Sequence, residues 1–350
     1  YNNTALWAVS IFFIIYLRGE NLMEKIKIGI YGYGNLGKGV ELALKNNPDM
    51  QLVGIFTRRN PTDVHALFKD TQVFSVDDAE KMKDKIDVMI LCGGSATDLP
   101  EQGPKVCKLF NTVDSFDTHA KIPEYFSKMN SVALESNTLA LISCGWDPGL
   151  FSLNRSLLES VLPNGNNYVF YGRGLSQGHS DALRRIKGVK NAVQYTVPYD
   201  EAVQKVRDGE NPEFASVRET MWRECFVVLE EGADKNKIEK EIKEMPNYFE
   251  PYNTVVHFIS EEELKENHNT MPHGGFVLRS GNTSENTNQI AEFSLKLDSN
   301  PEFTASVLVA YARAIYRMKN LGNTGAITVL DVPVSLLSSK NRDELLKEIL

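Results

Sequence analysis

The sequence predicts an α/β protein: a doubly wound parallel sheet in the first domain, followed by a separate α+β domain. Short apolar strands alternate with helical stretches over residues 23–148, a pattern typical of parallel sheets that helices cover on both faces. A glycine-rich turn joins the first strand to the first helix, as in dinucleotide-binding βαβ units. After residue 149 the strands are separated by charged helical stretches, which indicates a different kind of sheet.

Length and composition set the limits of this prediction. A chain of 350 residues exceeds what one hydrophobic core usually serves, so two domains are expected. With 42% hydrophobic and 24% charged residues the composition is that of an ordinary globular protein. The net charge of −8 offers no basic surface for nucleic acid. The four cysteines are widely spaced without a CxxC pair, which predicts buried thiols, no structural zinc and a cytoplasmic protein.

Residues 1–22 stand apart from the predicted fold. Ala5 to Leu17 is an apolar run that is short for a membrane span. It lacks the preceding basic residues and the cleavage site of a signal peptide. Because a strand pattern begins just after Met23, we interpret residues 1–22 as an upstream, non-native extension. A membrane anchor is the alternative.

The first domain, expected over residues 23–148, opens with a βαβ unit. A strand over Lys25–Tyr31 leads through the turn into a helix, which Asn46-Asn47-Pro48 ends before a second strand over Gln51–Phe56. Three later strands are expected at residues 86–92, 112–114 and 139–143. This alternation predicts the doubly wound sheet.

The second domain, expected over residues 149–350, is predicted to have an α+β fold. Strands are expected at residues 168–171, 193–197, 224–229, 254–259 and 275–279. Charged helical stretches such as Lys235–Glu244 separate them, which favours a mixed or antiparallel sheet. Asn300 and Pro301 then open a helix over residues 300–319, as cap and first helical residue. In enzymes of this architecture such a helix often packs back on the first domain, although its spacing alone does not show this.

The turn Gly32-Tyr33-Gly34-Asn35-Leu36-Gly37 has the GxGxxG pattern of the Rossmann fold. Its context supports a cofactor site, because it follows a strand and opens a helix. Gly32 permits the tight turn, Gly34 leaves bare backbone for a pyrophosphate, and Gly37 lets the helix pack on the strand. A flexible turn without a ligand is the alternative.

The residues at the end of the second strand indicate which cofactor the site binds. About twenty residues beyond Gly37, where an NAD-preferring protein usually carries an acid, the chain has Thr57-Arg58-Arg59. A hydroxyl and two guanidinium groups suit a 2′-phosphate. We therefore expect NADP, with a solvated arginine pair as the alternative. Cys92-Gly93-Gly94-Ser95, at the end of a later strand, is expected to extend the same crevice.

Four further segments are more particular than a generic fold requires: Val113–His119, Ser143–Gly149, Gly174–Arg185 and Met271–Gly275. In these segments, in the opening GYGNLG turn and in Gly93–Asp98, the chain resembles the meso-diaminopimelate dehydrogenase family. The resemblance runs from Met23 to near the C-terminus, and the run GLSQGHSDALRR is specific to that family.

The resemblance implies an oxidoreductase acting on a CH–NH2 group in lysine biosynthesis. The implied reaction is the reversible, NADP-dependent oxidative deamination of the D-centre of meso-2,6-diaminopimelate to L-2-amino-6-oxopimelate and ammonia; the product cyclises to tetrahydrodipicolinate. The resemblance also implies a homodimer whose second domain binds substrate and dimerises. Further cofactor contacts are implied at Ser115, Phe116, Cys144, Gly145 and Trp146.

Substrate contacts are implied at Asp117, Asp147, Tyr171, Gln177, Gly178, Thr196, Arg223, His273 and Asn300. The chemistry agrees, because Asp117 and Asp147 can receive ammonium groups. Arg223, His273 and Thr196 can receive carboxylate oxygens. Either aspartate is expected to take the ammonium proton or orient the water, and the sequence does not choose between them.

Each of these residues also has a structural alternative. Asp117 and Asp147 fit turn positions, His273 fits a buried structural histidine, and Asn300 fits a helix cap. Two positions depart from the family pattern, because Tyr171 stands where relatives carry Trp and Cys144 where they carry Thr.

Two other functions are alternatives to this one. Another NADP-dependent reductase of aspartate-family metabolism, such as a dihydrodipicolinate reductase or a homoserine dehydrogenase, would lack the run Gln177–Arg185. A non-catalytic NADP-binding sensor would have no use for Asp117, Asp147, Arg223 and His273 together.

Overall fold

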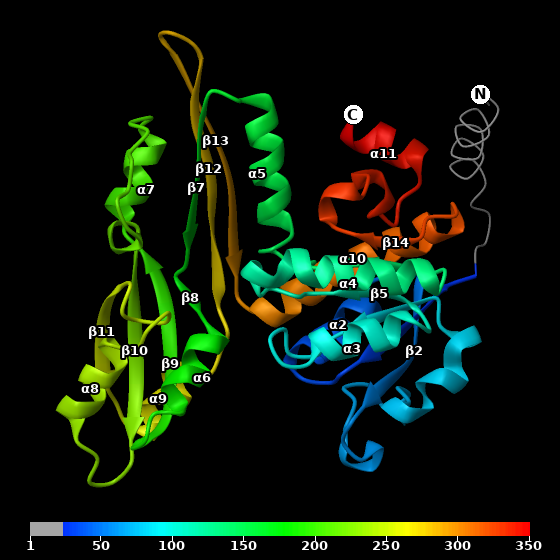
Figure 1. Cartoon of the computed structure of the whole chain (residues 1–350), viewed down its shortest axis with the longest axis horizontal. Coiled ribbons are helices and arrows are strands. Elements are labelled where there is room, and N and C mark those ends of the chain that lie inside the picture. The colour runs from blue at the N-terminus through cyan, green and yellow to red at the C-terminus, as the bar shows by residue number, and fades with distance from the viewer. Residues whose placement is uncertain (1–23) are drawn as a thin grey trace. The chain divides into compact units, whose positions relative to one another are not determined.

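A computed structural model describes residues 24–350, so the expected extension over residues 1–22 lies outside the described residues. The chain forms two units (Figure 1). The first contains the described residues up to Ser152 and resumes at Pro301–Leu350, and the second contains Leu153–Asn300. The expected domain boundary was residue 148, with residues 149–350 in the second domain and the helix over residues 300–319 as a segment that could pack back on the first. In the structure Pro301–Leu350, which includes most of this helix, belongs to the first unit.

A parallel sheet forms the centre of the first unit. Among residues 24–350 it has seven strands in the order β14-β6-β5-β4-β1-β2-β3, all paired in parallel. The strands are β1 (Ile26–Tyr31), β2 (Met50–Thr57), β3 (Val73–Ser75), β4 (Val88–Leu91), β5 (Asn111–Asp114), β6 (Leu139–Leu141) and β14 (Gly325–Ile327). The strand order reverses between β1 and β4, which is where such sheets bind ligands. The predicted Rossmann-type sheet is confirmed.

Helices cover this sheet, whose apolar strands must be buried on both faces. The α-helices of this unit are α2 (Asn35–Lys45), α3 (Leu99–Cys107), α4 (Ile122–Glu135), α10 (Asn300–Asn320) and α11 (Arg342–Ile349), of which α11 buries no residue. Short 3-10 helices lie at Pro61–Asp63, Val76–Lys85, His119–Lys121, Val329–Asp331 and Val334–Leu336. Helix α3 packs on α4. Helix α2 packs so closely on α10 that a Cβ added at Gly39 would lie 2.9 Å from the Cβ of Ala305. Within residues 24–350, no helix has the length and apolarity to cross a bilayer.

The second unit is built on two smaller sheets, in the orders β11-β10-β9-β8 and β13-β12-β7. Their strands are β7 (Gly165–Tyr171), β8 (Gly174–Leu175), β9 (Val189–Pro198), β10 (Met221–Leu229), β11 (Asn253–Phe258), β12 (His273–Ser284) and β13 (Thr287–Leu297). The pair β10–β11 is parallel and the other pairs are antiparallel. The helices are α5 (Leu150–Val161), which begins in the first unit, α6 (Gln177–Arg184), α7 (Asp200–Arg207), α8 (Lys235–Lys243) and α9 (Glu261–Asn267), with a 3-10 helix at Val217–Glu219. This mixed architecture is the α+β domain that the sequence predicted.

Strand β13 was not predicted from the sequence. Its second half carries the period-two signal of a strand: partly or fully buried apolar residues alternate with exposed polar ones, at Ala291, Phe293, Leu295 and Leu297. Its first half, Thr287–Ile290, is exposed and has no such pattern. Strand β12 pairs with both halves in the antiparallel sense, from His273↔Leu297 to Ser284↔Thr287. Pairing with β12 therefore extends the strand beyond the part that the local pattern indicates.

Arg313 in α10 attaches the C-terminal segment to the first unit. Its side chain is only 2% exposed. Nε and Nη2 donate to the two carboxylate oxygens of Asp49, at 2.6 and 2.8 Å, and Nη2 also donates to Asn47 Oδ1 at 2.6 Å. Nη1 donates to the carbonyl of Leu337 at 2.7 Å. Because Asp49 lies just before β2, these bonds explain why Pro301–Leu350 belongs to the first unit.

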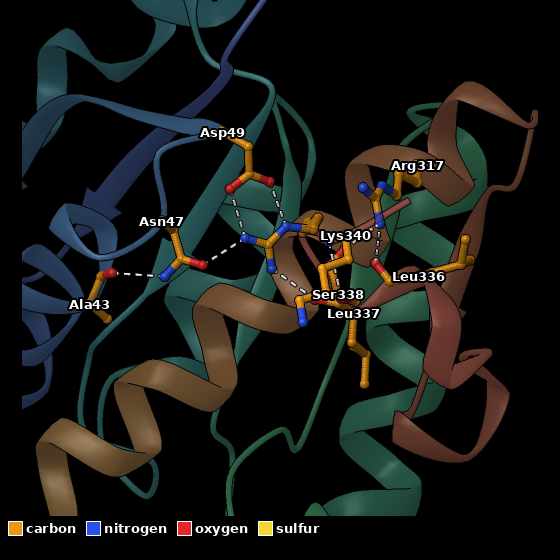
Figure 2. Close-up of polar contacts among 9 residues, drawn as sticks. Ala43, Asn47, Asp49, Arg317, Leu336, Leu337, Ser338 and Lys340 are labelled. Carbon is orange, nitrogen blue, oxygen red and sulfur yellow. Dashed lines mark hydrogen bonds and ion pairs between the residues drawn. The ribbon is translucent and has the colours of Figure 1, made fainter. Parts of the chain in front are cut away.

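Arg317, one helical turn later, extends the same attachment. Its Nη1 donates to the carbonyls of Leu336 at 3.1 Å and Ser338 at 2.7 Å (Figure 2). The segment after β14 is thus held by two guanidinium groups from α10. The carbonyls of the buried Leu336 and of the half-buried Leu337 and Ser338 receive hydrogen-bond donors in this way.

We expect Arg313→Met to destabilise the protein by about 2–3 kcal/mol. This is below the ~3–5 kcal/mol for breaking a fully buried pair, because the side chain of Asp49 remains 31% exposed to water. The measurement is urea-induced unfolding followed by fluorescence. Arg342→Met, at an exposed site in α11, is the matched control and should change stability by less than ~0.5 kcal/mol. Equal losses in the two variants would contradict the anchoring role.

The acid sensitivity of the fold should depend on Asp49. Burial alone raises the pKa of Asp49, but the hydrogen bonds and charge of Arg313 outweigh it, so the pKa lies below its usual value. A carboxyl whose pKa is lower in the folded state contributes stability that is present above the unfolded pKa, about 3.9, and is lost as the pH falls toward the folded pKa. Asp49→Asn should therefore be less stable than the wild type at pH 7 and lose less stability below about pH 4. Melting temperatures from pH 2.5 to pH 7 test this, and parallel curves for both proteins would refute it.

Candidate active site

A cavity of about 430 Å³ opens beside the carboxyl ends of β1, β2 and β4. It lies where the strand order reverses. The lining residues are Tyr31, Gly32, Tyr33, Gly34, Phe56, Thr57, Arg58, Arg59, Val76, Cys92, Gly93, Gly94, Asp98 and Gln102. The structure thus brings together the turn after β1, the end of β2 and the loop after β4, the three segments from which the sequence predicted a cofactor crevice.

The glycines of the first turn meet distinct steric demands. Gly32 has φ +97°, and a Cβ there would lie 3.2 Å from the carbonyl carbon of Cys92. A Cβ at Gly37 would lie 2.4 Å from the carbonyl oxygen of Gly32, so the helix could not pack as it does. Apart from Gly34 itself and its two neighbours in the chain, no atom of the described residues lies within 4 Å of a Cβ built on Gly34. Gly34 therefore leaves open space beside the N-terminus of α2, where backbone N–H groups can receive an anion.

The two arginines after β2 have different roles. Arg59 Nη2 donates to the carbonyl of Tyr33 at 2.6 Å, and the Arg59 N–H donates to Thr57 Oγ1 at 3.1 Å. Arg58 is 64% exposed and forms an ion pair with Asp98 at 2.9 Å. An exposed pair of this kind is worth little, so a ligand phosphate can replace the carboxylate. Arg59 thus supports the turn, whereas Arg58 is held at the cavity by a weak partner.

Helix α2 also holds the segment that follows β2 and its arginines. Glu41 is 2% exposed, and its carboxylate accepts the N–H of Leu67 at 3.0 Å and the hydroxyl of Thr71 at 2.7 Å. Tyr33 donates its hydroxyl to the same carboxylate. Burial and this bond to Glu41 raise the pKa of Tyr33, so its phenol stays protonated.

The loop after β4 is ordered by Asp98 and Ser95. Asp98 Oδ2 accepts the N–H of Gly94 at 2.9 Å. Ser95 Oγ accepts the N–H of Asp117 at 2.8 Å and lies 3.4 Å from Thr118 Oγ1. The loop after β4 therefore supports the loop after β5, which carries Asp117.

Several predicted cofactor residues do not line this cavity: Asn35, Leu36, Gly37, Ser95, Ser115, Phe116, Cys144, Gly145 and Trp146. Phe116 is buried and stacks on Tyr125 at 4.2 Å between ring centroids. Trp146 packs edge-on against Phe151 at 5.2 Å. Cys144 is fully buried, and burial raises the pKa of its thiol. These side chains pack in the core of the first unit.

Asp117 and Asp147 belong to the first unit, in the loops after β5 and β6. The other predicted substrate residues belong to the second unit. In its four-stranded sheet Thr196 and Arg223 are cross-strand partners. Arg223 donates through Nη1 to Thr196 Oγ1, and its guanidinium carbon lies 3.8 Å from the ring centroid of Tyr252.

Arg223 is a buried cation with donor capacity to spare. Its residue is 7% exposed, and its Nε has no hydrogen-bond partner among residues 24–350. Burial lowers the pKa of Arg223, but a guanidinium remains protonated in proteins. A buried charge of this kind calls for an anionic partner.

His273 joins Arg223 and Thr196 through Gly174. A Cβ added at Gly174 would lie 2.4 Å from His273 Nδ1, so the ring packs directly on that glycine. Gly174 in turn pairs with Thr196. Burial lowers the pKa of His273, and the charge of Arg223 lowers it further, so the ring is neutral at neutral pH. The structure thus brings three predicted substrate residues together.

The remaining predicted substrate residues gather near Met271 or lie on β7. The Gln177 side-chain amide lies 2.9 Å from Met271 Sδ, and the Asn300 N–H donates to the Met271 carbonyl at 2.9 Å. No described atom comes within 4 Å of a Cβ built on Gly178. Tyr171 ends β7 and pairs with Gly275.

The sequence missed several residues that shape these sites: Asp98, Gln102, Gln194 and Tyr252. Gln194 is fully buried, its Nε2 lies 3.5 Å from Thr196 Oγ1, and its Oε1 has no partner within the described part of the chain. The alternation of β9 could have indicated it, because residues two apart share a face. Tyr252 had no local signal, since only folding brings it to Arg223.

Known proteins resemble this chain over nearly its whole length. A family model described as the diaminopimelic acid dehydrogenase C-terminal domain matches residues 145–299. The meso-diaminopimelate D-dehydrogenase of Ureibacillus thermosphaericus is 66% identical over 328 residues, which are 94% of this chain and 100% of that protein.

Solved structures give the same result. A mutant meso-diaminopimelate dehydrogenase from Clostridium tetani, crystallised with DAP, is 55% identical with a TM-score of 0.89, over 93% of this chain and 100% of that one. An engineered D-amino acid dehydrogenase bound to NADP+ is 46% identical with a TM-score of 0.82, over 93% of this chain and 100% of that one. The chain therefore belongs to the meso-diaminopimelate D-dehydrogenase family.

Proposed function

We propose that this chain catalyses the reversible, NADP-dependent oxidative deamination of the D-centre of meso-2,6-diaminopimelate, giving L-2-amino-6-oxopimelate and ammonia, in lysine biosynthesis. Its family membership supports the reaction. The observation that carries the substrate class is the buried Arg223, whose Nε has no partner in the described residues. A buried guanidinium beside a hydroxyl suits a carboxylate, which diaminopimelate carries at both ends.

The first unit has the residues that NADP requires. The open space at Gly34 and the N-terminus of α2 would receive the pyrophosphate. Arg58 and Thr57 would hold the 2′-phosphate, with Arg58 leaving Asp98 for the stronger phosphate partner. Arg59 would act mainly by holding the Tyr33 carbonyl. When bound, NADP supplies the hydride acceptor, and the protein supplies orientation and charge.

In the second unit Arg223, Thr196 and His273 would bind the carboxylate of one end of the substrate. The neutral ring of His273 avoids repulsion with Arg223 while still offering an N–H donor. Gln177, Asn300, Gly178 and Tyr171 would complete the substrate site. A clamp of this kind fixes the orientation of the reacting carbon, which is where enzymes gain much of their rate.

Asp117 and Asp147 would carry the proton chemistry. A carboxylate can take a proton from the substrate ammonium group. The neutral amine could then become a protonated imine as the α-carbon gives its hydride to the oxidised cofactor. A carboxylate can then orient the water that hydrolyses this imine to a ketone and ammonia. Either aspartate could take the ammonium proton, and either could orient the water.

The proposal includes a homodimer in the cytoplasm. Leu157 and Val161 on α5 are 60% and 66% exposed, and Ile290 is exposed on β13, at the edge of its sheet. Exposed apolar residues near an unpaired strand edge suit a second copy of the chain. The four cysteines, all within the described residues, form no disulfide, which suits a reducing compartment.

Cofactor choice should depend on Arg58 more than on Arg59. Arg58→Gln should weaken NADP binding roughly ten- to a hundredfold, the effect of losing about 1.5–3 kcal/mol of charge-assisted bonding, and leave NAD binding nearly unchanged. Arg59→Gln should weaken both cofactors, because it frees the Tyr33 carbonyl. Fluorescence titration with both cofactors measures this, with the exposed Lys81→Gln as control. An Arg58→Gln enzyme that loses affinity equally for NADP and NAD would contradict the assignment.

The substrate clamp should make the enzyme stereospecific. Meso-diaminopimelate should reduce NADP and the L,L isomer should not, because the proposed reaction takes place at a D-centre, which the L,L isomer lacks. Arg223→Met should lower activity at least a hundredfold, the effect of a misplacement of about 1 Å, with unchanged NADP affinity. Arg218→Met, at an exposed site of the same unit, is the control. Comparable turnover of the L,L isomer, or full activity of Arg223→Met, would overturn the substrate site.

A further inference from the structure

Asp114 joins two loops of the first unit through a single oxygen atom. It is the last residue of β5 and is fully buried. Its Oδ1 accepts the N–H of Phe116 at 2.9 Å, in the loop after β5, and the N–H of Ser143 at 3.1 Å, in the loop after β6. Its Oδ2 accepts the hydroxyl of Tyr125 at 2.8 Å, from α4. One carboxylate oxygen thus serves both loops, and the other serves a helix.

The loop after β6 depends on this bond for its conformation. Ser143 has φ +55°, in the left-handed region that serine rarely adopts. In this conformation the successive N–H groups of Ser143 and Cys144 both reach Asp114, the first at Oδ1 and the second at its carbonyl oxygen, at 2.8 Å. A strained residue persists only where its surroundings fix it, and here Asp114 does so.

We propose that Asp114 is a positioning residue of the dehydrogenase reaction: its Oδ1 fixes the Asp117 loop and the Asp147 loop relative to each other. Asp117 directly follows Phe116, and Asp147 follows Ser143 within the same loop. The inference rests on the proposed function, which gives proton transfer to these two aspartates. It requires an acceptor at the position of Oδ1 and does not require a negative charge.

The protonation behaviour of Asp114 supports a role beyond stability. Burial raises its pKa to about 6, although the N–H groups of Phe116 and Ser143 and the hydroxyl of Tyr125 lower it in part. When the pKa of a carboxyl is higher in the folded than in the unfolded state, the free energy of unfolding decreases as the pH rises from the unfolded pKa, about 3.9, through the folded pKa. At neutral pH the charge of Asp114 therefore weakens the fold, and a neutral residue of the same shape would not.

Variants of Asp114 separate the acceptor from the charge. Asp114→Asn keeps an oxygen for both N–H groups and should retain kcat within about threefold, with an equal or higher melting temperature at pH 7. Asp114→Ala removes the acceptor and should lower kcat about a hundredfold, with little change in the KM for meso-diaminopimelate, whose clamp lies in the second unit. Asp114→Thr gives the same test if the Ala variant fails to fold, because the threonine side chain is too short for its oxygen to reach both loops.

Tyr125→Phe is the matched control, because it removes the one side-chain contact of Asp114 that reaches neither loop. It should retain kcat within about threefold. Wild-type kcat in the folded Ala or Thr variant would overturn the proposal, and so would an Asn variant as inactive as Ala. Asp117→Asn and Asp147→Asn separate the two hypotheses. Full activity of both the Asp117→Asn and the Asp147→Asn enzyme would refute the proposed proton chemistry. If either of these enzymes is inactive while the Ala and Thr variants of Asp114 are active, only the positioning role is refuted.

Discussion

The contact between α2 and the turn after β1 is the constraint on which the cofactor crevice depends. The carbonyl oxygen of Gly32 lies where a Cβ on residue 37 would be, 2.4 Å away, so only glycine lets the helix begin this close to the strand. That contact fixes where the first N–H groups of α2 point. It also places the Tyr33 carbonyl within reach of Arg59, which joins the turn to the end of β2. Two walls of the cavity, the turn after β1 and the end of β2, therefore depend on one steric requirement.

The fold of the first unit was largely predictable because its signals are local. Apolar strands, a glycine turn and short connections each lie within a few residues, and parallel strands leave little choice of order. Strand β13 was missed although Ala291–Leu297 alternates apolar and polar residues, and its exposed first half, Thr287–Ile290, has a partner only in β12. The return of the helix over residues 300–319 to the first unit was considered from the architecture alone, and its anchor was hidden, because Arg313 and Asp49 are far apart in sequence.

The cofactor segments were predictable for the same reason, and the structure brings the residues of three of them to one cavity. The sequence treated Arg58 and Arg59 alike, whereas their partners differ: a carboxylate for one and a backbone carbonyl for the other. Burial and cross-strand pairing are not local properties. For that reason the sequence indicated Arg223 and Thr196 only through a family resemblance, and did not indicate Tyr252 at all.

The discontinuity of the first unit bears on how the chain folds during synthesis. Strand β6 has β14 as its outer neighbour, and α10 is anchored at Asp49, so this unit is incomplete until α10 and β14 have left the ribosome. The second unit, Leu153–Asn300, is continuous and is fully available earlier. Domains usually complete their folding from the N-terminus onward as they emerge. Here the inserted unit is the first that can finish, and the nascent first unit must hold an open sheet edge at β6 in the meantime.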